Sequence, residues 1–207
     1  MQTTDWIAQL KDVFLKPLPG KDAQYRMSPP GRRQAVTEKP FRRSGVLLLL
    51  YPYHDLISIV FIKRAEYNGI HSGQVSFPGG MFEEKDVTLE QTAVRETMEE
   101  TGVKAGEINI IGKLTPLYIE VSNTEVFPFV AVCQQRPDFM HDPAEVQYVI
   151  EAPLRELLMP ENCRTKLMEI GGKRIPVPYY DIQHHHIWGA TAMILSEFLE
   201  MLKNSDE

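Results

Sequence analysis

Residues 75–103 read VSFPGGMFEEKDVTLEQTAVRETMEETGV, and this stretch decides the fold because it joins a strand, a glycine turn, an acidic loop and a helix. A short strand is predicted over Val75 to Phe77, directly before the chain-breaking Pro-Gly-Gly sequence. The two glycines, Gly79 and Gly80, let the backbone adopt positive φ or approach a ligand closely. Taken alone, the glycines are more typical of an ordinary tight turn.

A helix is predicted next, from Leu89 to Thr101. Thr88 is followed three residues later by Gln91, the capping-box pattern that satisfies free amide groups at the start of a helix. Gly102 stands where a left-handed residue usually ends one. Both helix boundaries therefore follow from local signals.

The predicted helix carries three carboxylates, Glu96, Glu99 and Glu100, at spacings of three and four residues. At about 100° per residue they share one face, and Val94 and Met98 are expected to point the opposite way, toward a core. Like charges on one face repel, whereas a divalent cation such as Mg²⁺ takes oxygen ligands and would hold them together. An acidic face exposed to water is the simpler alternative for such a turn.

Strands and helices alternate through the rest of the chain. A hairpin is predicted before the central stretch, with strands over Val46 to Tyr51 and Leu56 to Lys63. The later expectations are strands at Ile108–Leu114 and Val126–Val132, a short helix at Pro153–Leu158, two strands joined by Gly171-Gly172, and a closing amphipathic helix at Ala190–Leu202. The pattern predicts a mixed α/β domain.

The first forty residues are expected to differ from the rest. Asp5 to Leu15 has apolar residues at helical spacing, and the sequence from Lys21 to Pro40 shows little periodicity. We therefore predict an N-terminal helix and an extended arm over residues 1–40, packed on a domain that spans residues 41–207.

The composition predicts a soluble cytoplasmic protein. The chain has 207 residues, enough for one ordinary domain, and its net charge of -6 argues against binding nucleic acid by bulk attraction. No apolar run is long enough to cross a membrane. Two cysteines, Cys133 and Cys163, form no disulfide framework and lack a motif for a nucleophile.

The stretch Gly80 to Val103 resembles the Nudix box, whose pattern is Gly, five residues, Glu, seven residues, then Arg-Glu-apolar-x-Glu-Glu-x-Gly-apolar. The second half matches except that Thr97 takes the apolar place. In the first half Asp86 replaces the Glu, and eight residues separate it from Arg95. The resemblance implies a Nudix-type α/β/α sandwich, with a mixed sheet between helices.

The longer box is similar to that of one subgroup, the coenzyme A diphosphatases. This subgroup has an upstream signature of Arg, Ser, three residues, Arg, x, His, x, Gly, x, Val, x, Phe-Pro-Gly-Gly. Matching residues are Arg64, His71, Gly73, Val75 and Phe77 to Gly80, whereas Ala65 and Gly69 depart from it. Further similarity at Asp142 to Val146 and His186 to Ala192 extends the resemblance over most of the chain.

The resemblance implies hydrolysis of a diphosphate bond with Mg²⁺ or Mn²⁺. Glu96 and Glu100 are the first-choice metal ligands, Glu99 is the third, and the Gly79 carbonyl could face the same cluster. By the same resemblance Glu96, or a glutamate near it, could instead be the base for the attacking water. Arg95 would orient a carboxylate through a bidentate hydrogen bond.

A carboxylate from a later loop commonly completes a Nudix site. Glu145 is our choice for this catalytic carboxylate because it lies in the matching Asp-Pro-x-Glu-Val segment, with Glu120 and Glu125 as rivals. Arg64, His71 and the Gly80 turn are expected to bind substrate phosphates. The arginines Arg32, Arg33, Arg42 and Arg43 are better explained as a solvated basic patch.

The implied substrate is a nucleotide of the coenzyme A type, cleaved to 3′,5′-ADP and 4′-phosphopantetheine. Two alternatives stay open, namely another nucleoside diphosphate derivative such as ADP-ribose and a Nudix module that binds a nucleotide without cleaving it. A homodimer is compatible with the resemblance. The run His184-His185-His186 is expected to be structural or solvent-facing, because three consecutive side chains do not readily face one ion.

Overall fold

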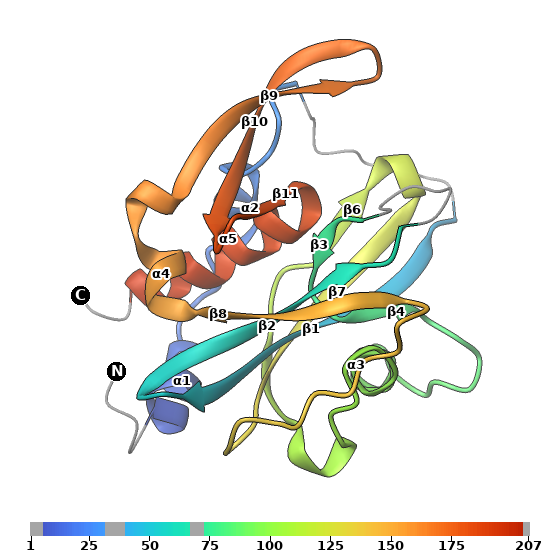
Figure 1. Cartoon of the computed structure of the whole chain (residues 1–207), viewed down its shortest axis with the longest axis vertical. Coiled ribbons are helices and arrows are strands. Elements are labelled where there is room, and N and C mark those ends of the chain that lie inside the picture. The colour runs from blue at the N-terminus through green and yellow to red at the C-terminus, as the bar shows by residue number, and fades with distance from the viewer. Residues whose placement is uncertain (1–5, 32–39, 67–72, 205–207) are drawn as a thin grey trace.

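A mixed β-sheet occupies the centre of the structure (Figure 1). The computed structural model describes three segments of the chain, residues 6–31, 40–66 and 73–204. β1 (Arg42–Tyr53) and β2 (Leu56–Arg64) form the expected antiparallel hairpin. β7 (Thr124–Val132) runs parallel to β1 on the side away from β2, which makes the sheet mixed.

Shorter strands extend this sheet. β5 (Asn109–Lys113) pairs with β7, and β8 (Val146–Pro153) pairs with β2, both antiparallel. β6 (Leu117–Ile119) also pairs with β7. β3 (Val75–Ser76) pairs with β2, and β4 (Gly79–Met81) pairs with the first part of β1. The glycine turn is therefore anchored on both strands of the central hairpin.

Helices cover both faces of the sheet, as Figure 1 shows. Side chains alternate between the two faces of a strand, so Leu47 and Leu49 of β1 pack toward α3 (Leu89–Thr101), whereas Leu48 packs in the larger core with α5 (Gly189–Lys203). All three leucines are fully buried. The predicted α/β/α sandwich with a mixed sheet between helices is confirmed.

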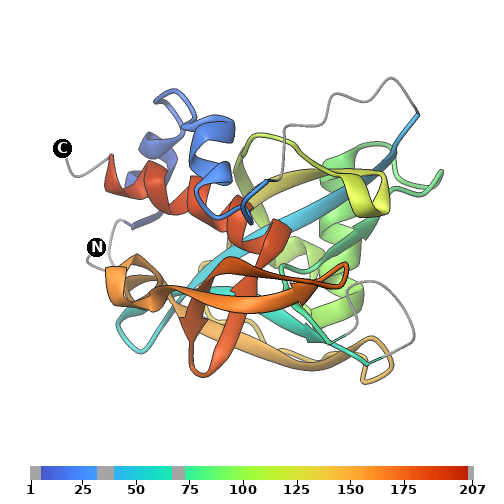
Figure 2. The ribbon, with the colours of Figure 1, turned by 90° about the horizontal axis from the view of Figure 1, so that it is seen from above.

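The N-terminal helices lie against α5 (Figure 2). α1 (Trp6–Val13) falls within the helix predicted near the N-terminus and buries Trp6 and Leu10. α2 (Gly20–Tyr25) lies in a stretch for which no helix was expected. This part of the chain is a second short helix because its side chains find partners on α5, a tertiary effect that local periodicity does not report.

A buried glutamate of α5 holds these segments together. Glu197 is fully buried, and its carboxylate accepts hydrogen bonds from the Gly20 amide at 3.2 Å and the Gln24 side-chain amide at 2.8 Å. The Thr115 hydroxyl donates to the same carboxylate at 2.6 Å. These donors compensate the cost of burying a carboxylate, because each replaces a hydrogen bond to water.

A second, three-stranded sheet projects beyond the central one (Figure 1). It consists of β9 (Cys163–Ile170), β10 (Lys173–Ile182) and β11 (His185–Trp188). The predicted turn at Gly171-Gly172 joins β9 to β10. α4 (Leu154–Leu158) connects this hairpin to β8, and three single turns of 3-10 helix lie at Ala105–Glu107, Glu120–Ser122 and Pro160–Asn162.

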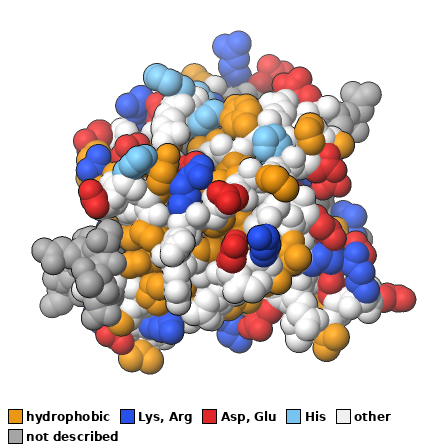
Figure 3. Space-filling model, turned by 60° about the horizontal axis from the view of Figure 1, so that its bottom comes forward, with side chains coloured by type: hydrophobic (Ala, Val, Ile, Leu, Met, Phe, Trp, Pro, Cys, Tyr) orange, Lys and Arg blue, Asp and Glu red, His pale blue; other side chains and the backbone are white. Residues whose placement is uncertain are grey.

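The surface carries charges of both signs. On the face drawn in Figure 3, acidic and basic side chains lie close to one another among hydrophobic ones. In the part of the chain that the structure describes, no helix has the length and apolar character needed to span a bilayer.

Candidate active site

The glycine turn lies directly against β1. A Cβ atom at Gly79 would overlap the carbonyl oxygen of Gly45 and lie 2.6 Å from the Cα of Val46. Gly79 also has a φ of 151°, which favours glycine. Its amide consequently points at the carboxyl-terminal half of α3 and donates to Oε2 of Glu100 at 2.8 Å.

Helix α3 approaches the sheet just as closely. A Cβ at Gly45 would lie 2.5 Å from the Leu89 carbonyl oxygen and 3.3 Å from the Cβ of Ala93. Both predicted caps are confirmed, since the Thr88 hydroxyl accepts from the Gln91 amide at 3.2 Å and Gly102 has a φ of 76°. The close packing against β1 and the two helix caps fix the position of the carboxylates on α3.

The expected core face of α3 was wrong. Val94 is only partly buried and Met98 is 39% exposed, whereas the small residues Ala93 and Thr97 are fully buried against the sheet. The reason is the close contact at Gly45, which leaves room for small side chains and none for large ones. Compared with the predicted core face of Val94 and Met98, the face of α3 that meets the sheet is therefore rotated toward Glu100.

Glu100 is a buried carboxylate, 2% exposed, with both oxygens engaged. Oε2 accepts from the Gly79 amide, and Oε1 accepts from a guanidinium nitrogen of Arg64 at 3.1 Å. Burial raises the pKa of Glu100 to about 7, with the charges of Glu96 and Glu145 adding to the rise, although both hydrogen-bond donors act to lower it. A further positive charge beside Arg64 would relieve more of this cost.

Glu96 lies one helical turn before Glu100 and fills the space above Gly80. A Cβ at Gly80 would overlap the carboxylate atoms of Glu96, so only glycine leaves this side chain where it is. Burial raises the pKa of Glu96 against the lowering effect of Arg95, and the charges of Glu99 and Glu145 raise it further. The charge of Glu96 also raises the pKa of Glu100, so the two carboxylates lie within electrostatic reach of each other.

Arg95 connects the acidic loop to the helix. Its guanidinium donates to both carboxylate oxygens of Asp86 at 2.9 Å, and to Glu96 at 2.8 Å and Glu99 at 3.0 Å. Asp86 is 6% exposed and also accepts from the Thr92 hydroxyl at 2.9 Å. In the sequence Asp86 is only a departure from the Nudix pattern, but in the structure it is the bidentate partner of Arg95.

We expect Asp86→Asn to destabilise the fold by about 2 kcal/mol at pH 7, the value typical of a hydrogen bond to a charged partner. The Arg95 hydrogen bonds hold the pKa of Asp86 below its usual 3.8, so the stabilisation is complete above that value and is lost as the pH falls below it. Urea unfolding of both proteins at pH 7 and near pH 3 measures the difference, which should shrink at low pH.

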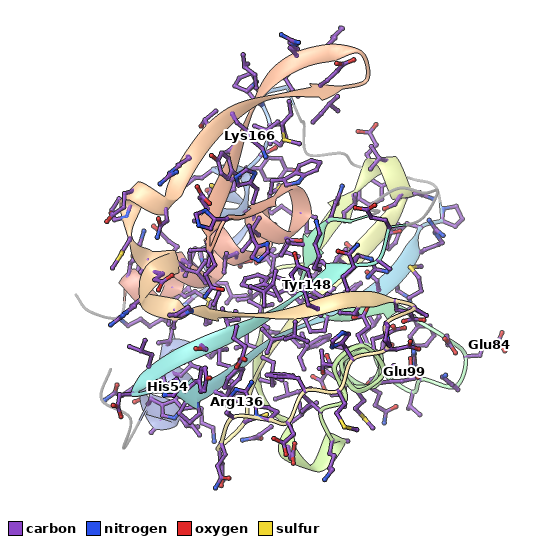
Figure 4. All side chains as sticks on the ribbon, in the orientation of Figure 1. His54, Glu84, Glu99, Arg136, Tyr148 and Lys166 are labelled. Atoms are coloured by element: carbon purple, nitrogen blue, oxygen red, sulfur yellow. The ribbon has the colours of Figure 1, made fainter. Side chains whose placement is uncertain are left out.

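The matched control for this prediction is Glu84→Gln on the same loop. Glu84 is exposed and points away from the domain (Figure 4). Its replacement should leave the free energy of unfolding unchanged at both pH values. An Asp86→Asn protein as stable as the wild type at pH 7 would contradict the structural role given to the Asp86–Arg95 pair.

The remaining glutamates differ in position. Glu145 precedes β8, where its carbonyl accepts from the Ala65 amide at 2.8 Å, and its charge acts on both Glu96 and Glu100. Glu99 is on the exposed side of α3 (Figure 4), with its side chain 49% exposed. Glu120 lies in an exposed 3-10 turn, and Glu125 lies on β7.

No three Asp, Glu, His or Cys side chains within the described segments already converge as a metal site. Arginine side chains hold the carboxylates instead, with Arg95 on Glu96 and Arg64 on Glu100. The donor chemistry nevertheless fits a hard cation, because Glu96 and Glu100 are carboxylate oxygen donors whose pKa is raised by burial and further by the charges of nearby glutamates.

Several expected residues lie outside the described segments or away from the site. His71, Arg32 and Arg33 fall outside the described residues. Arg42 donates to the Ser122 carbonyl at 2.7 Å, and the Arg43 guanidinium lies 4.9 Å from the ring centre of Phe82. The stacking of Arg43 on Phe82, at the end of the glycine turn, had no signal in the sequence.

The three consecutive histidines form no metal cluster with the other described residues. His184 has a φ of 66° in the turn before β11, where His185 packs beside Tyr148 and His186 beside Tyr179. Their side chains thus take separate structural positions. Cys133 is buried in a mainly apolar cluster, and burial raises its pKa to about 12, which does not favour a thiolate.

Fold and site together define a class of protein, an α/β sandwich in which a glycine turn faces a helix bearing acidic side chains. The NUDIX domain family matches residues 41–167. A relative from Arabidopsis thaliana, named Nudix hydrolase 15, mitochondrial, is 32% identical over 161 residues, which cover 74% of this chain and 56% of that protein. This chain belongs to the Nudix hydrolase family.

Other relatives agree with this assignment. A Photorhabdus laumondii protein named uncharacterized Nudix hydrolase NudL is 28% identical over 180 residues, which cover 87% of this chain and 94% of that one. A MutT/nudix family protein from Enterococcus faecalis has a similar crystal structure, with a TM-score of 0.55 and 15% identity over 95% of this chain and 74% of that one. The chain spans little more than half the length of the two Arabidopsis relatives it matches, 56% and 57%.

Proposed function

We propose that this protein hydrolyses the diphosphate bond of coenzyme A or its derivatives with Mg²⁺ or Mn²⁺, giving 3′,5′-ADP and 4′-phosphopantetheine. The observation that carries the proposal is the pair of desolvated carboxylates, Glu96 and Glu100, one helical turn apart and facing the glycine turn. Burying two carboxylates together costs free energy, and a divalent cation that assists phosphate chemistry would offset that cost.

Each residue of the site has a part in this proposal. Glu96, Glu99 and Glu100 would hold the metal, with the Gly79 carbonyl as a further oxygen donor. The bound cation would neutralise phosphate charge and polarise the attacking water. Glu96 or a neighbouring glutamate accepts the proton of that water, and Glu145 completes the carboxylate set from across the site.

Arg95 supports catalysis by position. It is fixed by Asp86 and in turn holds Glu96 and Glu99, so the orientation of these two carboxylates depends on the loop that carries Asp86. Gly80 leaves space for Glu96 and brings the backbone close to where a phosphate would lie. These contacts preorganise the ligands, which reduces the reorganisation needed when substrate binds.

The coenzyme A assignment is supported by the residues before the glycine turn. Arg64, Gly73, Val75 and the Phe77–Gly80 segment match the signature of that subgroup, and the one-residue-longer Nudix box matches as well. Ala65 and Gly69 depart from the signature, so ADP-ribose and other nucleoside diphosphate derivatives stay in the test as competing substrates.

The test is product analysis by chromatography after incubation with Mg²⁺ or Mn²⁺ and either coenzyme A or ADP-ribose. Faster release of 3′,5′-ADP from coenzyme A supports the proposal. A parallel tube with dephospho-coenzyme A shows whether the 3′-phosphate is recognised. Cleavage of ADP-ribose alone would show that the substrate is another nucleoside diphosphate derivative and not coenzyme A. No cleavage of any nucleotide in a wider panel would favour a module that binds a nucleotide without cleaving it.

A further inference from the structure

Arg64 was expected to bind substrate, yet in the structure it holds a carboxylate of the site. One of its guanidinium nitrogens lies 3.1 Å from Oε1 of Glu100, whose other oxygen is taken by the Gly79 amide at 2.8 Å. With Glu100 only 2% exposed, neither oxygen can gain a new ligand without adjustment of an existing contact.

The two partners of Glu100 differ in their freedom to move. The Gly79 amide belongs to β4, which pairs with β1, and the space where a Cβ of Gly79 would lie is filled by Gly45 and Val46. Arg64 instead ends β2, and its side chain is 27% exposed and has several rotatable bonds. Arg64 is consequently the partner that can leave Glu100.

We propose that Arg64 is a positioning residue that exchanges between two anions. It holds the Glu100 carboxylate while the site has no cation, and it binds a phosphate of the substrate once a divalent cation takes its place at Glu100. This inference rests on the proposed function, in which Glu100 is a metal ligand and the substrate carries a diphosphate.

The exchange links the binding of metal and substrate. A guanidinium left beside a divalent cation is repelled, whereas a diphosphate offers it a bidentate contact. Binding of the metal therefore prepares the arginine for the substrate, and by thermodynamic linkage the substrate strengthens metal binding. A purely structural arginine would lack this link, because it would keep its place on Glu100 in both states.

The exchange predicts opposite effects of one substitution. Arg64→Gln should tighten Mn²⁺ binding in the absence of substrate by about tenfold, because the competing cation is gone, a factor that corresponds to roughly 1.4 kcal/mol. The same variant should raise KM by about tenfold, because the phosphate contact is lost. Arg64→Lys should lie between wild type and Arg64→Gln in both measurements, since it keeps the charge and loses the planar fork.

Isothermal titration with Mn²⁺ at pH 8.5, without nucleotide, measures the first effect, and steady-state kinetics with the better cleaved of coenzyme A and ADP-ribose measures the second. Arg155→Gln is the matched control. Arg155 lies on α4, so this substitution removes the same charge at a position away from Glu100. Circular dichroism checks that each variant is folded.

Tighter Mn²⁺ binding together with a higher KM in Arg64→Gln, and neither change in Arg155→Gln, supports the exchange. Unchanged or weaker Mn²⁺ binding by a folded Arg64→Gln protein, with normal binding by the wild type, would overturn the exchange and leave the proposed function intact. Absence of Mn²⁺ binding by the wild-type protein would overturn the proposed function and the exchange with it.

Discussion

Replacement of Glu100 by Gln is expected to lower turnover by about a thousandfold or more, because it removes a negatively charged ligand from the proposed metal site. Metal-assisted stabilisation of the transition state is worth several kcal/mol, and about 4 kcal/mol corresponds to a thousandfold in rate. The measurement is kcat with saturating Mn²⁺ and the substrate that product analysis identifies.

The same substitution should not weaken the fold. Burial raises the pKa of Glu100 to about 7, so at pH 8 the folded protein bears the cost of an ionised buried carboxylate that the unfolded chain does not have. Gln removes that charge at nearly constant volume, and the free energy of unfolding at pH 8 should therefore be at least that of the wild type. Glu90→Gln, at an exposed position of α3, serves as the control for both quantities. Near-normal turnover in Glu100→Gln would rule out the assigned site.

Gly80→Ala is expected to reduce turnover by about a hundredfold while the stability changes little. The new methyl group would overlap the carboxylate of Glu96, which lies at the end of a flexible side chain and can swing aside at small cost. A displacement of about 1 Å at a catalytic group is enough for a loss of this size. Turnover and the thermal unfolding midpoint, measured on the same preparation, test the two halves of this expectation.

Gly106→Ala is the matched control for this change. A Cβ at Gly106 meets no other atom within 4 Å, and the residue is not among the positive-φ glycines, so activity and stability should both equal those of the wild type. A Gly80→Ala protein with full activity would show that Glu96 keeps its position by another route. The role assigned to the glycine turn would then be wrong.

The parts of the fold that could be predicted from sequence are those that depend on near neighbours. The helix from Leu89 to Thr101 was predicted with its correct ends, because Thr88 and Gly102 act within a few residues of the turns they cap. The β1–β2 hairpin and the closing helix follow from similar local patterns. The Glu96 and Glu100 pair, at a spacing of four residues, also lies on one side of the helix.

The parts that could not be predicted depend on contacts between distant residues. The sequence does not show that Gly45 allows α3 to approach the sheet closely. Without that contact, Met98 would be expected in the core and Glu100 at the surface. The pairing of Arg64 with Glu100 has the same origin, because it requires the ends of β2 and α3 to meet. Such contacts are set by packing, which periodicity along one helix does not contain.

The buried carboxylate of Glu197 constrains when α2 can dock on α5 during synthesis of the chain. Its donors on Gly20 and Gln24 precede it by 177 and 173 residues, so they leave the ribosome long before their acceptor exists. Synthesis proceeds from the N-terminus, and the central hairpin is made well before α5. The hydrogen bonds from α2 to Glu197 can therefore form only after α5 has been synthesised.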